Sequence, residues 1–216
     1  IDYYLEMVKA LGCADVDRAL HLETRLSTAA AREILHKYLP ENNRPLIGIA
    51  PGATYGPAKR WLPERFAQAG ESLAKKLDAK VLLFGGGDDR ETAELVRGQA
   101  QTDMINLAGR ASLPDSVYLI SQCRLFLSND SGLMHVAGGL NIPTVAIFGS
   151  TNPVTTSPAG ERTMLVRKET PCSPCLKKTC PTDFRCMTAV TVEDVVEAAL
   201  TLLNGTAGPR PDNQKS

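Results

Sequence analysis

The chain has 216 residues, of which 43% are hydrophobic, enough for one large domain or one domain with extensions. Its 24 basic and 24 acidic residues cancel, which argues against a general nucleic-acid-binding surface. No apolar run reaches the roughly 18 residues of a membrane-spanning helix, and no charged segment followed by a short apolar core indicates a signal peptide.

The sequence of residues 1–45 predicts two helices that connect to the rest of the protein. They are Tyr3–Leu11 and Thr28–Leu39, the second with Ser27 as its N-cap and Pro40 as its stop. Residues 15–26 between them are expected to be irregular or to form a short strand.

Beyond residue 45, short apolar runs alternate with longer helical segments. The runs predict strands at Leu46–Ala50, Val81–Phe84, Met104–Leu107, Leu125–Leu127 and Thr144–Phe148. The other segments predict helices at Pro63–Leu77, Asp89–Ala100, Pro114–Gln122, Ser131–Leu140 and, after an irregular region, Val192–Leu203, capped by Thr191. The tail, residues 205–216, is rich in Gly, Pro and polar residues and is expected to be disordered.

Continuous apolar strands separated by helices favour a parallel sheet that is covered on both faces. The predicted fold class is therefore α/β, a doubly wound, Rossmann-like parallel sheet over residues 46–204. In such sheets ligands bind beyond the carboxyl ends of the strands. The loops at that edge are residues 51–60, 85–89, 109–113, 129–132 and 149–158, all rich in small or polar residues.

The loop Asn129–Gly132 lies where a predicted strand ends and a helix begins. The free backbone amides and the dipole of such a helix start favour an anion, most naturally a phosphate. Asp130 or Ser131 could equally be a plain N-cap. His135 lies one turn further along the same helix face, where packing is the commoner role for a lone histidine.

The loop "PGATYGPAKRW", residues 51–61, has the composition of a diphosphate site. Gly52 and Gly56 allow close backbone approach, Thr54 offers a hydroxyl, and Lys59 and Arg60 offer positive charge. A solvated loop is the alternative.

The run "FGGGDDRE" has Arg90 where a dinucleotide fingerprint needs its third glycine, and no P-loop pattern occurs. A nicotinamide-dependent dehydrogenase is therefore disfavoured.

Together with "SNDSGLMHVAGGLNIPTVAIFGSTNP" at residues 128–153, the loop at 51–61 resembles the bacterial ADP-heptose:lipopolysaccharide heptosyltransferases, glycosyltransferase family 9, and most closely their heptosyltransferase II branch. The resemblance implies a GT-B fold of two Rossmann-like halves. This chain resembles the carboxy-terminal, donor-binding half, and the amino-terminal half, which carries the proposed catalytic base, is expected to be missing.

The resemblance also implies roles for individual residues. Lys59 would stabilise the leaving diphosphate, with Thr54 beside it, and Asp130 would contact the heptose. Ser131 and Gly132 would meet the phosphates, and His135 would face the donor. Asp88 or Asp89 falls near the position of an acidic residue that contacts the nucleotide.

The implied reaction is inverting transfer of heptose from ADP-L-glycero-D-manno-heptose to the inner core of lipopolysaccharide. No catalytic residue other than Lys59 is expected in this chain, and no cofactor is required, because Lys59 and a helix N-terminus can carry the charge of the leaving ADP. The partners would be the donor, a lipid A–core acceptor and the missing half, with a location in the cytoplasm at the inner membrane. Alone, this chain should bind the donor and transfer poorly or not at all.

Four cysteines, Cys172, Cys175, Cys180 and Cys186, lie in the loop 172–186. A Cys-x2-Cys pair with two further thiolates could hold a structural zinc or an iron–sulfur cluster. The spacing of the last two fits no standard zinc finger, so reduced thiols or a redox disulfide remain alternatives.

Two other functions stay open at this point. One is a non-catalytic module that binds a nucleotide or nucleotide sugar, and the other is a different GT-B enzyme such as a sugar-nucleotide epimerase. A second Rossmann-like half upstream would favour the transferase over the module. Product analysis with ADP-heptose would decide between the transferase and the epimerase.

Overall fold

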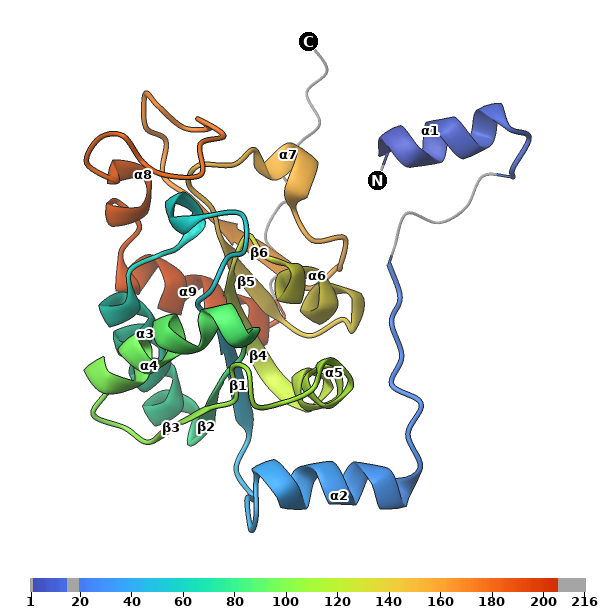
Figure 1. Cartoon of the computed structure of the whole chain (residues 1–216), viewed down its shortest axis with the longest axis vertical. Helices are drawn as coiled ribbons and strands as arrows, with labels where there is room; N and C mark the ends of the chain where they lie inside the picture. Colours follow the sequence, from blue (N-terminus) through green and yellow to red (C-terminus); the bar gives the residue numbers. More distant parts are fainter. Residues whose placement is uncertain (1, 15–19, 206–216) are drawn as a thin grey trace.

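A computed structural model describes residues 2–14 and 20–205 of the chain. Its centre is one six-stranded parallel sheet in the order β3-β2-β1-β4-β5-β6 (Figure 1). The strands are β1 (Leu46–Ala50), β2 (Lys80–Leu83), β3 (Met104–Asn106), β4 (Cys123–Asn129), β5 (Thr144–Ile147) and β6 (Thr163–Val166). The strand order reverses between β1 and β4, as in Rossmann folds. The predicted doubly wound α/β fold is confirmed.

Helices cover both faces of this sheet (Figure 1). The long helices are α1 (Asp2–Ala10), α2 (Thr28–Tyr38), α3 (Pro63–Leu77), α4 (Arg90–Gln99), α5 (Leu113–Ser121), α6 (Gly132–Gly139) and α9 (Val192–Leu203). Short turns of helix lie in the loops: η1 (Pro57–Lys59), η2 (Gly87–Asp89), α7 (Pro153–Thr156) and α8 (Arg185–Thr188).

Alternation along β1 divides the core into two layers. Ile47 and Ile49 pack with α3, α4 and α9 on one face, whereas Leu46 and Ala50 pack with α2, α5 and α6 on the other. Both faces are apolar, so every residue of β1 is buried. Gly48 lies under Phe126, whose ring would be 2.4 Å from an added Cβ, and this close approach requires glycine.

The N-caps predicted for α2 and α9 are observed. The Ser27 hydroxyl accepts a hydrogen bond from the amide of Ala30, and Thr191 and Asp194 cap α9 reciprocally. Residues 20–26 are irregular, as expected, while residues 15–19 and 206–216 lie outside the described part of the chain. No helix among the described residues is long and apolar enough to cross a membrane.

Two differences from the predicted elements affect the carboxyl edge of the sheet. Strand β6 was missed: it is an edge strand with only Val166 buried, so it lacks a continuous apolar run. Strand β4 is longer than predicted, because Ser128 and Asn129 continue the pairing with β1 and β5. Asn129 is therefore the last residue of a strand and is not in a loop.

Candidate functional site

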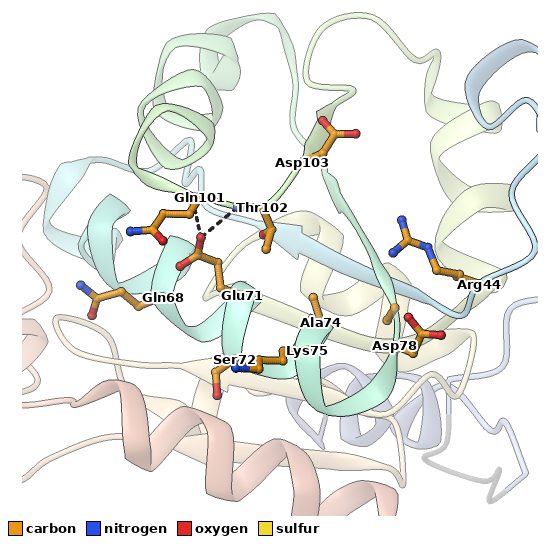
Figure 2. Close-up of a pocket in the computed structure, with 11 residues that line it drawn as sticks. Arg44, Gln68, Glu71, Ser72, Ala74, Lys75, Asp78, Gln101, Thr102 and Asp103 are labelled. Atoms are coloured by element: carbon orange, nitrogen blue, oxygen red, sulfur yellow. Dashed lines mark hydrogen bonds between the residues drawn. The ribbon is translucent and has the colours of Figure 1, made fainter.

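One pocket lies at the amino edge of the sheet (Figure 2). Its volume is about 820 Å³. It carries side chains of both charges, including Arg44, Lys75 and Asp78. Glu71 accepts hydrogen bonds there from the backbone amides of Gln101 and Thr102, so its carboxylate secures the loop before β3. This is the edge opposite to the one where α/β sheets bind ligands.

The second pocket, of about 420 Å³, lies at the carboxyl edge. Four of the five predicted loops line it, with residues 52–54, 85–89, 111 and 113, and 131–132. Phe84, Leu133 and Val136 add apolar surface. Small polar groups over an apolar floor are typical of a site for an organic ligand with a polar end.

Lys59 and Asp130 form an ion pair beside this pocket. The Lys59 Nζ lies 2.7 Å from Asp130 Oδ2, and the two side chains are only 12% and 5% exposed. The sequence placed these residues in separate loops, and the structure brings them together. A pair so removed from water depends on both partners, because either charge alone would be poorly solvated.

The fifth loop supplies two further partners of Asp130 that the sequence did not single out. The hydroxyls of Thr151 and Thr156 donate to Asp130 Oδ2 at 2.6 and 3.2 Å. Only the position of Thr151 and Thr156 in a loop at the carboxyl edge could have indicated them. Asp130 is thus held by three donors and does not act as an N-cap, which was the alternative for its carboxylate.

Asn129 fastens the loop that carries Lys59 to the end of β4. Its side chain is fully buried. Its Oδ1 accepts from the backbone amide of Trp61 at 2.9 Å, and its Nδ2 donates to the Pro51 carbonyl at 2.7 Å. These bonds satisfy two buried backbone groups at either end of the loop 51–61.

The start of α6 faces the same pocket. Ser131 occupies the N-cap position without a capping hydrogen bond from its side chain, and its Oγ lies 3.1 Å from Ser128 Oγ. Ser131 and Gly132 both line the pocket, as does Thr54 across from them. The first amides of α6 remain available to an anion there.

Asp88 and Asp89 also line this pocket. Asp89 Oδ2 accepts from the Gly86 amide at 3.0 Å, and its carboxylate lies against Gly52, where an added Cβ would be 2.0 Å from Asp89 Oδ1. A side chain at position 52 would therefore displace this carboxylate.

His135 is half-buried in the first turns of α6. Burial lowers the pKa of His135 below its usual value of 6.5, the charge of Asp130 opposes this change, and the charge of Lys59 adds to it. The imidazole is thus close enough to the Lys59–Asp130 pair to respond to its charges, and the structure favours the neutral ring.

This lowered pKa predicts a pH dependence of stability. As the pH falls below about 6.5, the unfolded chain binds a proton at His135 before the folded chain does, so the free energy of unfolding decreases. The loss should be complete once the pH is below the folded pKa. Denaturant titrations of the wild type and His135→Gln from about pH 7.5 to pH 5 measure it: the difference between them should change in this window, and parallel curves would contradict the prediction.

The predicted metal site at the four cysteines is not supported. Among residues 2–14 and 20–205, no three His, Cys, Asp or Glu side chains are arranged to hold a metal ion. Cys186 is buried, and its sulfur lies against Gly149, whereas Cys172 is exposed. Burial, and then the charges of Cys172, Cys175 and Cys180, raise the pKa of the Cys186 thiol. The spacing of the cysteines in the sequence did not indicate which of them are buried and which are exposed.

Comparison with known proteins agrees with this geometry. Residues 5–184 match the model of glycosyltransferase family 9 (heptosyltransferase). The chain is 44% identical over 137 residues to the lipooligosaccharide heptosyltransferase 2 of Haemophilus ducreyi, an alignment that covers 61% of this chain and 39% of the relative.

Two solved structures have the same fold. Heptosyltransferase II of Escherichia coli superposes with a TM-score of 0.73 at 30% identity, covering 85% of this chain and 54% of the other. A family 9 glycosyltransferase of Veillonella parvula gives 0.78 at 28% identity, covering 94% and 60%. The chain thus spans little more than half the length of these structures and less of the Haemophilus relative. On the family match over most of its length, the chain belongs to glycosyltransferase family 9.

Proposed function

We propose that this chain is the donor-binding half of a GT-B heptosyltransferase of the heptosyltransferase II type. The observation that carries the proposal is the meeting of Lys59, Asp130 and the start of α6 beside a pocket at the carboxyl edge of the sheet. The pocket has room and apolar surface for a nucleoside, and the cation and the helix amides suit a diphosphate.

In the proposed reaction, an acceptor hydroxyl of the lipopolysaccharide inner core attacks the anomeric carbon of ADP-heptose, and ADP leaves with inversion. Negative charge develops on the diphosphate as the sugar bond breaks. Lys59 and the amides of Ser131 and Gly132 would stabilise that charge, and the proposal requires no cofactor. Asp130 would hold heptose hydroxyls, and His135 would face the donor.

The base that accepts the proton from the acceptor would come from an amino-terminal half, to which the helices in residues 1–45 would connect. The lipid A–core acceptor places the reaction at the cytoplasmic side of the inner membrane. We therefore expect the 216-residue chain to bind donor without efficient transfer.

The nucleotide preference tests this proposal. Calorimetry on this chain should detect ADP binding, and UDP should bind more weakly, because the relatives suggest an ADP-linked donor. GDP and NAD serve as further comparisons. Equal or tighter binding of UDP would remove the heptosyltransferase assignment.

A further inference from the structure

The cysteine-rich segment packs onto the proposed donor site. The Lys178 carbonyl accepts a hydrogen bond from the amide of Ala58, in η1, at 3.0 Å. The Leu176 carbonyl accepts from the Tyr55 hydroxyl at 2.8 Å, and the Leu176 amide donates to the Ser150 carbonyl at 2.7 Å. Residues 176–178 therefore connect the loop that carries Lys59 to the loop that carries Thr151.

The contact is close enough to restrict the sequence on the other side. A Cβ added to Gly56 would lie 2.4 Å from the Lys178 carbonyl oxygen. Because that atom belongs to the backbone, no side-chain movement could relieve the clash. Glycine at position 56 thus serves the approach of residue 178, in addition to any approach of a ligand.

This arrangement brings a second amino group to the loop. Lys59 Nζ and Lys178 Nζ lie 5.0 and 5.8 Å from the centroid of the Tyr55 ring, both within the range of a cation–π contact. Tyr55 directly follows Thr54, which lines the pocket. Lys178 and Lys59 therefore contact the same ring, whose residue is the chain neighbour of a pocket-lining residue.

The charges around the pocket favour a second cation for a bound diphosphate. Asp88 and Asp89 line the pocket, and no Lys or Arg is among its lining residues in the described chain. The charge of Lys59 is already matched by Asp130 at 2.7 Å. A diphosphate approaching Lys59 would therefore meet no net positive charge from this pair.

Lys178 can supply the net positive charge that the Lys59–Asp130 ion pair lacks. Within the described residues it has no carboxylate as an ion-pair partner, and its side chain is exposed. Arg60, the neighbouring cation, directs its guanidinium to the Ala53 carbonyl and the Thr92 hydroxyl, both at 3.4 Å. An exposed lysine on a four-carbon stem can turn from the Tyr55 ring toward a bound phosphate.

We propose that residues 176–178 support the two loops that carry Lys59 and Thr151 at the donor site, and that Lys178 is a second cation that binds the diphosphate. The inference rests on the proposed function, since it presumes a nucleoside diphosphate as ligand. It assigns a binding role to the segment whose cysteines suggested a metal. Residues 176–178 contribute through their backbone contacts and one side chain, so the role does not depend on the cysteines.

Lys177 offers a matched control, because it is an exposed lysine next to Lys178 that has no ring contact or ion pair within the described chain. Calorimetry with ADP on the 216-residue chain should give about tenfold weaker binding for Lys178→Ala, as expected for one charge-assisted contact. Lys177→Ala should match the wild type. Melting temperatures of both variants should equal that of the wild type, since neither side chain is buried.

Equal ADP affinity of Lys178→Ala and Lys177→Ala, with normal binding by the wild type, would overturn the role of Lys178 and leave the proposed function intact. If the wild type does not bind ADP at all, the proposed function and this inference fall together.

Discussion

Asn129→Leu should lower the free energy of unfolding by about 3 kcal/mol and weaken ADP binding at the same time. The substitution removes the acceptor of the Trp61 amide and the donor to the Pro51 carbonyl. Both backbone groups then remain buried without a partner, which costs about 1–3 kcal/mol each. A leucine also fills the space that a compensating water would need.

The weaker ADP binding is expected because Asn129 holds the loop that carries Lys59. Its two hydrogen bonds fix both ends of the loop 51–61 to the end of β4, next to Asp130 in the chain. When they are lost, Lys59 is no longer held over Asp130, so ADP affinity should fall by about tenfold or more, a difference of about 1.4 kcal/mol. Urea titration and calorimetry measure the two effects separately.

Trp61→Phe is the control for this prediction. It removes the hydrogen bond from the indole Nε1 to the Val190 carbonyl, 3.1 Å long, and leaves the amide bond to Asn129 unchanged. Stability should decrease, while ADP affinity should stay near that of the wild type. If Trp61→Phe weakened ADP binding as much as Asn129→Leu, general loss of stability would explain both results.

Much of this fold was predictable because the local pattern and the final packing agree. The bounds of β1, α3 and α9 match the prediction residue for residue. In β1 the unbroken apolar run reflects burial on both faces, and in α3 a proline in the first turn marks the start. Strand β6 has no such signal, since its side chains are mostly half-buried at the sheet edge.

The sequence could indicate which loops form the candidate site. It could not indicate which side chains within these loops contact one another. The rule that parallel strands place their carboxyl ends together selected all five loops. It could not indicate that Thr151 and Thr156 donate to Asp130, because those bonds join residues 21 and 26 positions apart. The same limit applies to residues 176–178, whose nearness to Tyr55 depends on how a long irregular segment folds back.

Breaking the Lys59–Asp130 ion pair should also have a large effect on stability. In Lys59→Met, the Asp130 carboxylate would keep only the two threonine hydroxyls while remaining 5% exposed. Removing one partner of a buried ion pair typically costs about 3–5 kcal/mol, and we expect about 3 kcal/mol because the hydroxyls remain. ADP binding should weaken as well, because the variant lacks the cation of the diphosphate site.

Asp130→Asn should behave differently. Lys59 is more exposed than Asp130 and its long stem can carry the ammonium toward water, so the loss of stability should be smaller. With the negative charge gone, Lys59 no longer divides its interaction between Asp130 and a phosphate. ADP should therefore bind Asp130→Asn more tightly than it binds the wild type, while ADP-heptose should lose affinity relative to ADP if Asp130 holds heptose hydroxyls.

The double variant, Lys59→Met with Asp130→Asn, separates charge from packing. It should be more stable than Lys59→Met alone, because the buried carboxylate that lacked its partner is now a neutral amide. A double variant no more stable than Lys59→Met would show that the aliphatic stem of Lys59, and not its charge, is what the fold needs.

Weaker binding of both ligands to Asp130→Asn, with a lowered melting temperature, would contradict the sugar-contact role of Asp130. Tighter binding of ADP together with weaker binding of ADP-heptose would support it, since a residue that repels the phosphates can still retain the sugar.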